Sequence, residues 1–174
     1  GTDFIQFMPL VERPTPDGIP ECYEVTDRSV SPAGYGRFLV EVFDEWVRRD
    51  VGTVYVQMFD STLASFVGAP GALCVHARTC GTSLALEHNG DVYSCDHFVE
   101  PEHLLGNISS THMLELVASP QQRAFGKAKL DSLPGYCLAC DVRFACNGGC
   151  PKDRFTLTPD GEPGLHYLCP SYQL

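Results

Sequence analysis

The feature that most constrains this chain is a run of fourteen residues, CLACDVRFACNGGC at 137–150, that holds four cysteines. Four more flank this run at some distance, namely Cys74, Cys80, Cys95 and Cys169. A ninth, Cys22, lies far upstream in an acidic, proline-rich stretch. Cysteines gathered at such density act as disulfides, as metal ligands or as catalysts.

The disulfide interpretation is the weaker one. The number of cysteines is odd, and nine in 174 residues is a lower density than small disulfide scaffolds show. No basic segment followed by an apolar one marks a secretory signal. The sequence therefore predicts a cytoplasmic protein, in whose reducing surroundings clustered cysteines are ligands or catalysts. Cys22 matches no ligand position and is expected to be a free thiol.

Charge and hydropathy restrict the partners. The net charge is −10, from twelve Lys and Arg against twenty-two Asp and Glu. No basic stripe offsets this acidity, so nucleic acid is not an expected partner. The longest apolar stretches have the length of strands, so we expect no membrane-spanning segment.

The first part of the chain has an α/β pattern. Residues 4–10 and 53–59 are expected to be strands, 32–49 an amphipathic helix and 61–67 a short helix. One strand–helix–strand unit cannot cover both faces of its own sheet. The chain also enters its first apolar run almost at once. We therefore expect a C-terminal fragment of a longer protein, whose residues 1–70 are an α/β remnant.

The pattern changes near residue 70. Elements become short and glycine turns multiply, which predicts a second, small α+β domain over 71–174. Asn89-Gly90 between two apolar runs indicates a β-hairpin, and 104–108 is a possible third strand. Helices are expected at 112–118 and from 120 to about 130, the second opening with a capping box at Ser119.

The cysteine spacings predict two sites of four ligands. In bacterial ferredoxins the fourth cysteine of a comparable run binds the other cluster. By analogy, Cys150 crosses over and the eight cysteines separate into two sets. The first set is Cys74, Cys80, Cys95 and Cys150, and the second set is Cys137, Cys140, Cys146 and Cys169.

The metal itself is less constrained than the ligands. Four thiolates suit an iron–sulfur cube or a zinc ion. Zinc knuckles usually pair two CxxC elbows, and here only Cys137 and Cys140 form one, which favours iron and sulfur. Gly148 and Gly149 suit a loop that wraps tightly around a bulky group, with backbone N–H groups close to its sulfides.

The cysteine pattern resembles a known family. Cys80 and Cys95 on either side of Gly90, the CxxCx5Cx3C run and the late Cys169 look like the SPASM auxiliary-cluster domain of radical S-adenosylmethionine enzymes. Within these enzymes the chain is most similar to the anaerobic sulfatase-maturating enzymes. The additional resemblance lies in Cys74, the Cys95-Asp96 dipeptide, and the segments FIQFMPLVE, VYVQMFD and LLGNI.

This resemblance implies two [4Fe–4S] clusters, bound by the two sets given above. It implies that Asp96 is the catalytic base that deprotonates the substrate side chain. The reaction would be the oxidation of a cysteine or serine of a sulfatase polypeptide to formylglycine. A flavodoxin or ferredoxin would be the electron donor. S-adenosylmethionine and a third [4Fe–4S] cluster would bind to the preceding part of a partial TIM-like barrel, of which residues 1–70 resemble only the last strand–helix unit.

The chain departs from the family in one respect. The Cx3Cx2C motif of the radical-generating cluster is absent, so we expect this polypeptide alone to be inactive. Two other interpretations remain at this stage. The same domain also occurs in enzymes that make thioether bridges in peptides, and the cysteines could belong to a non-catalytic zinc-binding module that binds a protein partner.

The histidines are scattered along the chain. His76 and His97 lie close to ligand cysteines in sequence, where they can hydrogen-bond cluster sulfur or carboxylates. The remaining four are expected at the surface, namely His88, His103, His112 and His166.

Overall fold

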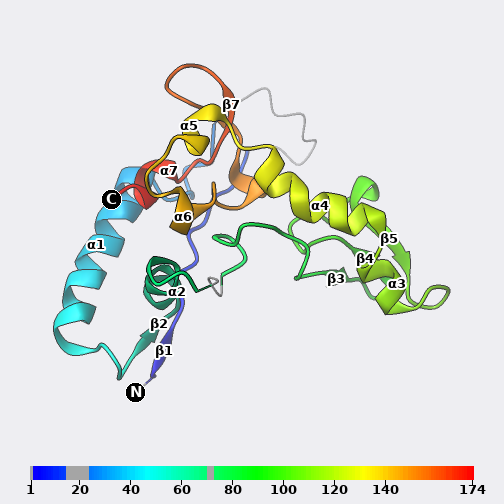
Figure 1. The fold of residues 1–174 in the computed structure, drawn as a ribbon, viewed down its shortest axis with the longest axis horizontal. Helices are drawn as coiled ribbons and strands as arrows, with labels where there is room; N and C mark the ends of the chain where they lie inside the picture. The colour runs from blue at the N-terminus through cyan, green and yellow to red at the C-terminus, as the bar shows by residue number, and fades with distance from the viewer. Residues whose placement is uncertain (1, 15–23, 70–72) are drawn as a thin grey trace.

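The computed structural model describes residues 2–14, 24–69 and 73–174 (Figure 1). Cys22 and the expected domain boundary at residue 70 lie outside these ranges. One end of the molecule carries β1, β2, α1 and α2, and the other end carries the sheet β3–β5 with α3. The helix α4 runs between the two ends, and the short elements α5–α7 lie nearer to α1 and α2.

The first part is a strand–helix–strand unit. β1 (Phe4–Ile5) pairs in parallel with β2 (Tyr55–Val56), and α1 (Pro32–Arg49) lies between them in sequence. The hydroxyl of Ser31 accepts a hydrogen bond from the Gly34 N–H and caps this helix, whose first residue is a proline. The predicted bounds of α1 are confirmed.

Both strands are shorter than predicted. After Val56 the chain turns into α2 (Gln57–Phe66), so the expected strand over 53–59 is wrong in its second half. The Asp60 carboxylate accepts a hydrogen bond from the Val56 N–H at 3.0 Å and so stabilises this helix start. The helix turns Phe59 onto Trp46, and both form a buried core with Val56.

The second part contains a small antiparallel sheet. β4 (Asp91–Tyr93) lies between β3 (Ala85–Leu86) and β5 (Leu104–Asn107), which follows the one-turn 3₁₀ helix Pro101–His103. Gly90 has a φ of 92° in the turn between β3 and β4, a conformation that glycine adopts without steric cost. The side chain of Val92 is completely buried behind the sheet.

Two helices follow the sheet, α3 (Met113–Val117) and α4 (Pro120–Asp131), and they confirm the two predicted helices. The Ser119 hydroxyl accepts a hydrogen bond from the Gln122 N–H, as in a capping box. In a full capping box the Gln122 side chain would also accept a hydrogen bond from the Ser119 N–H, and it does not. Its side-chain amide instead donates hydrogen bonds to two distant carbonyl oxygens, those of Gly81 and Ser94.

The last third consists of short elements that return the chain to α1. They are α5 (Gly135–Leu138), α6 (Arg143–Cys146), a 3₁₀ turn (Pro151–Asp153), the paired strands β6 (Thr156–Leu157) and β7 (Pro163–Leu165), and α7 (Cys169–Tyr172).

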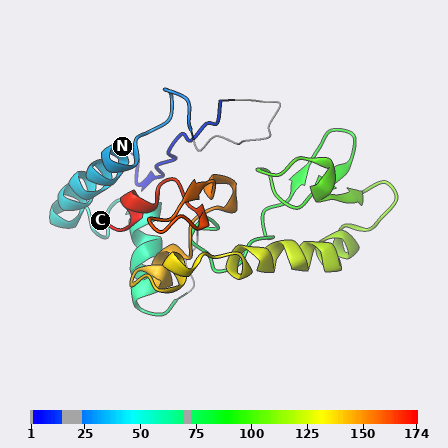
Figure 2. The ribbon, with the colours of Figure 1, turned by 90° about the horizontal axis from the view of Figure 1, so that it is seen from above.

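Helix α7 packs on α1, as two views of the molecule show (Figures 1 and 2). The Ser171 hydroxyl donates a hydrogen bond to the Pro32 carbonyl at 2.6 Å, and the Tyr167 hydroxyl donates one to the Val30 carbonyl. The end of the chain is thereby fixed to the start of α1. Among the described residues, no helix is both long and apolar enough to cross a bilayer.

Candidate metal centre

The eight cysteines of the two predicted sets are all free thiols. Within the first set, neighbouring thiols affect one another. Burial raises the pKa of Cys80, and the nearby Cys74 raises it further. Burial raises the pKa of Cys95 to about 12, with a contribution from Cys150, and Cys150 in turn interacts with Cys80. These interactions link four cysteines that are far apart in the sequence.

The second set is linked in the same way. Burial raises the pKa of Cys137, and Cys146 and Cys140 raise it further. Burial also raises the pKa of Cys169 to about 12, with contributions from the other three thiols. All four side chains line one cavity between α5, α6 and α7. Cys146 therefore lines this cavity, whereas Cys150, four residues later, is not among its lining residues.

One face of α4 holds the segments that carry the first set. Its buried residues are Gln122, Gly126 and Lys129, which lie on one face at intervals of four and three residues. Gln122 donates to carbonyls beside Cys80 and Cys95. The Cys80 N–H donates to the Gly126 carbonyl at 3.1 Å, and a Cβ on Gly126 would lie 2.7 Å from the Cys80 oxygen.

Lys129 completes this face of α4. Its ammonium group donates hydrogen bonds to the carbonyls of Cys74 at 2.7 Å and Val75 at 2.9 Å. Only 1% of the residue is exposed, although a buried lysine is rare unless it is paired. From its start to its end, the helix therefore contacts the backbone next to Cys95, Cys80 and Cys74, which is the reverse of their order in the sequence.

The loop between the two sets depends on glycine. Asn147, Gly148 and Gly149 have φ values of 48°, 74° and 64°, so three consecutive residues lie in the left-handed region. The Gly149 N–H donates to the Cys146 carbonyl at 3.0 Å, and burial raises the pKa of the Cys146 thiol while the backbone N–H groups of Gly148 and Gly149 lower it. A Cβ on Gly149 would collide with the ring of His166. The approach of these backbone N–H groups to the sulfides of a cluster stays a prediction.

Two histidines are buried beside this loop. Burial lowers the pKa of His76 to about 4 and that of His166 to about 3. The ring of Tyr172 lies between them, 5.0 Å from one ring and 5.4 Å from the other. The expectation that His166 lies at the surface is wrong, since the residue is only 2% exposed. His97 is exposed, and its backbone N–H lowers the pKa of Cys95 against the larger effect of burial.

Comparison with known proteins agrees with a cysteine-ligated metal site. Residues 74–141 match the model of SPASM, an iron–sulfur cluster-binding domain. A serine-type anaerobic sulfatase-maturating enzyme of Bacteroides thetaiotaomicron is 51% identical over 97% of this chain and 43% of its own length. This chain is related to the anaerobic sulfatase-maturating enzymes. It spans about two fifths of the length of the curated relatives that it matches.

Other maturating enzymes are more distant. The serine-type enzyme of Klebsiella pneumoniae is 33% identical over 99% of this chain and 40% of its own length. The cysteine-type enzyme of Clostridium perfringens is 30% identical over 83% and 39%. A solved structure described as native anSMEcpe with bound AdoMet and Cp18Cys peptide has a TM-score of 0.72 at 30% identity, covering 85% of this chain and 41% of its own.

The distances between the metal-binding side chains bear on whether each set of cysteines could hold a single zinc ion. Within the described residues, no three Cys, His, Asp or Glu side chains converge closely enough to hold a single metal ion. A tetrahedral zinc site keeps each sulfur about 2.3 Å from the ion. Closing either set around one zinc ion would therefore require the side chains to move together.

Asp96 lies directly beside a ligand of the first set. Its residue is exposed, and its carboxylate accepts a hydrogen bond from the Cys95 thiol at 3.2 Å. Ligand cysteines bind metals as thiolates. Ligation of Cys95 would therefore remove this donor and leave the Asp96 carboxylate available to another proton donor on the exposed side of the site.

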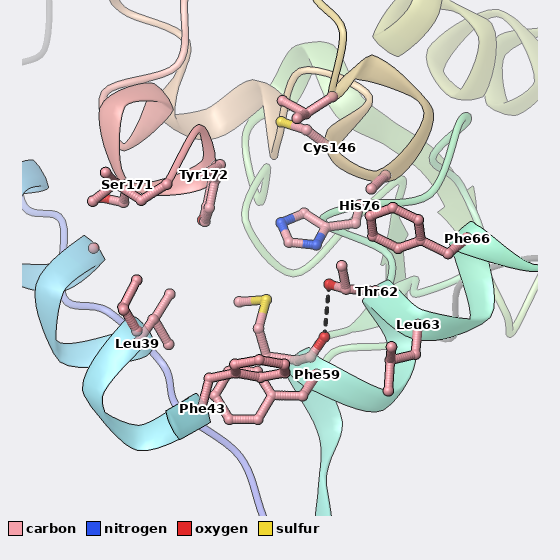
Figure 3. Close-up of a pocket in the computed structure, with 16 residues that line it drawn as sticks. Leu39, Phe43, Phe59, Thr62, Leu63, Phe66, His76, Cys146, Ser171 and Tyr172 are labelled. Atoms are coloured by element: carbon pink, nitrogen blue, oxygen red, sulfur yellow. Dashed lines mark hydrogen bonds between the residues drawn. The ribbon is translucent and has the colours of Figure 1, made fainter. Parts of the chain in front are cut away.

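A separate apolar cavity lies next to the second set. It has a volume of about 360 Å³ and is bounded by α1, α2, α6 and α7. Aromatic rings of Phe43, Phe59 and Phe66 line it, and Figure 3 shows the His76 ring and Cys146 across the cavity from Phe43 and Phe59. The Nε2 atom of His76 has no hydrogen-bond partner among the described residues.

The sequence did not point to three residues that organise the site: Gln122, Lys129 and Arg154. Each is a long polar side chain that donates at least one hydrogen bond to a carbonyl 25 to 55 residues away. Such partners become visible only once the fold is known. The one available signal is that Gln122 and Lys129 share a face of a helix with little amphipathic character.

Proposed function

We propose that this chain binds two [4Fe–4S] clusters. The first would be held by Cys74, Cys80, Cys95 and Cys150, and the second by Cys137, Cys140, Cys146 and Cys169. The observation that carries the proposal is the cavity lined by four of the free thiols, those of Cys137, Cys140, Cys146 and Cys169, and the attachment to one face of α4 of the backbone beside Cys74, Cys80 and Cys95 supports it. The match to an iron–sulfur cluster-binding domain supports it.

We further propose that the chain is the C-terminal part of a radical S-adenosylmethionine enzyme that matures sulfatases. Residues 1–70 would be the end of its partial barrel, and 71–174 the auxiliary-cluster domain. The parallel pairing of β1 with β2 around α1 supports the first assignment, because this is the repeating unit of such barrels. Similarity to maturating enzymes over nearly the whole chain supports the second.

The target would be a serine of a sulfatase polypeptide. The relatives of 51% and 33% identity are serine-type enzymes, whereas the cysteine-type relative is 30% identical. Oxidation of the serine side chain to an aldehyde removes two hydrogens, one as an atom from the β-carbon and one as a proton from the hydroxyl, together with one electron. The clusters, when bound, supply sites that can accept an electron.

Within this reaction the chain would provide the base. The Asp96 carboxylate is exposed, lies beside a cluster ligand and would lose its present donor when Cys95 is ligated. A carboxylate within hydrogen-bond reach of the substrate hydroxyl can accept its proton. The position of Asp96 next to the first set brings the proposed proton acceptor and electron acceptor to the same edge of the protein.

Anaerobic reconstitution with iron and sulfide tests the cluster proposal. We expect a brown protein with about eight irons per chain. Replacing Cys169 with Ala should remove the iron of the second site and leave that of the first, and replacing Cys80 should do the reverse. Loss of both sites in each variant, or two zinc ions and no inorganic sulfide after anaerobic preparation, would contradict the proposal.

The enzyme proposal is tested with the full-length maturating enzyme that contains this sequence. Asp96→Asn should retain its iron and lower formylglycine formation in a serine-containing sulfatase peptide by about 10²–10⁴-fold. Glu100→Gln, which removes another exposed carboxylate from the same loop, serves as the matched control and should not change the rate. Turnover by Asp96→Asn at the rate of the unmodified enzyme would remove Asp96 from the mechanism.

A further inference from the structure

A single guanidinium group binds the whole linker between the two cysteine sets. The linker is Asn147, Gly148 and Gly149, which joins Cys146 to Cys150. Arg154 donates hydrogen bonds from Nε to the Gly148 carbonyl at 2.8 Å and from Nη2 to the carbonyls of Asn147 at 3.0 Å and Gly149 at 3.2 Å. All three carbonyls of the linker therefore point to one side chain.

The same guanidinium also binds the helix that holds the first set. Its Nη1 atom donates a hydrogen bond to the Lys129 carbonyl at 2.6 Å, near the end of α4. Lys129 in turn donates to the Cys74 and Val75 carbonyls. A continuous chain of hydrogen bonds thus runs from the linker through Arg154 and α4 to the backbone of the most upstream ligand.

The guanidinium also brings positive charge to both sets. Burial lowers the pKa of Arg154, and four thiols oppose this effect, Cys137 and Cys146 from the second set and Cys80 and Cys150 from the first.

For Lys129, burial again lowers the pKa. Three thiols of the first set oppose this effect, namely Cys80, Cys150 and Cys74, and Lys129 also lowers the pKa of one thiol of the second set, Cys146. Arg154 therefore faces both sets of thiols, whereas the charge of Lys129 faces chiefly one of them.

We propose that Arg154 is a positioning residue that holds the two cluster sites in their interleaved arrangement and stabilises the reduced state of both. This inference rests on the proposed binding of two [4Fe–4S] clusters. Only a planar fork with several donors can bind three successive carbonyls and a fourth on another element. Loss of the fork lets the linker adopt other conformations and so misplaces Cys146 and Cys150 together, one in each site.

The charge has a separate effect. Reduction adds negative charge to a cluster, and a buried cation close to it favours the reduced state. Neutralising Arg154 should therefore make both reduction potentials more negative. Neutralising Lys129 should act mainly on the first site.

The test uses the chain after anaerobic reconstitution with iron and sulfide, with each site measured alone in Cys80→Ala and Cys169→Ala backgrounds. Arg154→Lys keeps the charge and loses the fork, so iron at each site should fall to less than about half of its normal content. Arg154→Gln keeps part of the hydrogen bonding and loses the charge, so the clusters that do form should have more negative potentials at both sites.

Two further variants complete the test. Lys129→Met should shift the reduction potential of the first site to more negative values, and by more than it shifts the potential of the second site. Lys127→Met, on the exposed side of the same helix, should change neither potential. Normal iron in Arg154→Lys would overturn the positioning role, and unchanged potentials in Arg154→Gln would overturn the role of its charge. Failure of the unmodified chain to take up iron and sulfide would instead contradict the proposed function.

Discussion

The two parts of this molecule are stabilised in different ways. In residues 2–66, Trp46, Val56 and Phe59 form an apolar core against which aliphatic side chains of α1 and β1 pack. In 73–174, the corresponding cluster contains two of the cysteines, with Cys137 inside it and Cys169 packed against it. Nearly all the buried polar side chains also lie in this second part.

The difference shows what each part requires in order to fold. An apolar core gains its stability from burial and needs no further component. Buried polar groups cost free energy unless every one is satisfied. In the second part, Gln122, Lys129 and Arg154 donate hydrogen bonds to the backbone near the cysteines, whereas the Nε2 atoms of His76 and His166 and the Oε1 atom of Gln122 have no hydrogen-bond partner among the described residues. The eight cysteines of this part are free thiols.

Metal removal should therefore give the largest difference between the two parts. Structural metal sites contribute on the order of 10 kcal/mol or more to folding. After removal of iron under anaerobic conditions, we expect the amides of α4 and of the 137–150 loop to lose protection against hydrogen exchange. Amides of α1 should retain most of theirs. Equal loss of protection in α1 would show that the apolar core does not stabilise the first part independently.

A core substitution should produce the opposite result. Trp46 is 4% exposed, and its indole N–H donates to the Val54 carbonyl at 2.7 Å. Trp46→Ala should lower the free energy of unfolding of the first part by about 3–5 kcal/mol, measured by denaturant titration, without changing the iron content. Val47→Ala, at an exposed neighbouring position, is the control. Iron loss in Trp46→Ala would mean that the two parts fold as one unit.

Replacing a glycine of the linker should have an effect of intermediate size on stability and on iron binding. Gly149 has a positive φ, and a Cβ there would collide with His166. Gly149→Ala should destabilise the second part by about 1–3 kcal/mol and reduce the iron bound at both sites.

Gly161→Ala separates backbone strain from the collision. Gly161 has a φ of 89°, and a Cβ there would meet no atom within 4 Å. This variant should therefore retain its iron and show a smaller loss in thermal unfolding. Equal losses in the two variants would indicate that backbone strain alone, and not the contact with His166, accounts for the effect.

The two helix caps should give the smallest effects. Ser31 caps α1 and Ser119 caps α4, in both cases by accepting a hydrogen bond from a backbone N–H. Replacing either with Ala should cost about 1 kcal/mol. Because α4 holds the first cysteine set, only Ser119→Ala should also speed the loss of iron to a chelator. Equal rates of iron loss in both variants would show that α4 does not control the first site.

The sequence predicted the longer helices better than the side chains that support the cysteine loops. The bounds of α1 follow from a helical spacing of apolar residues and from a Ser-Pro cap. Both signals depend only on residues that are close together in the sequence. The strand expected over 53–59 was too long, because α2 begins at Gln57. Phe59, an aromatic residue that suits a strand, lies in this helix and packs against Trp46. Burial of His166 depends on the contact with Gly149, seventeen residues away.

The most direct test of the account is an anomalous difference map at the iron absorption edge, from crystals of the anaerobically reconstituted chain. The account predicts two compact groups of iron, with Cys150 bound to the group that also contacts Cys74, Cys80 and Cys95. Cys146 should bind the other group. A map in which Cys146 and Cys150 ligate the same group, or in which single zinc atoms occupy the two sites, would contradict it.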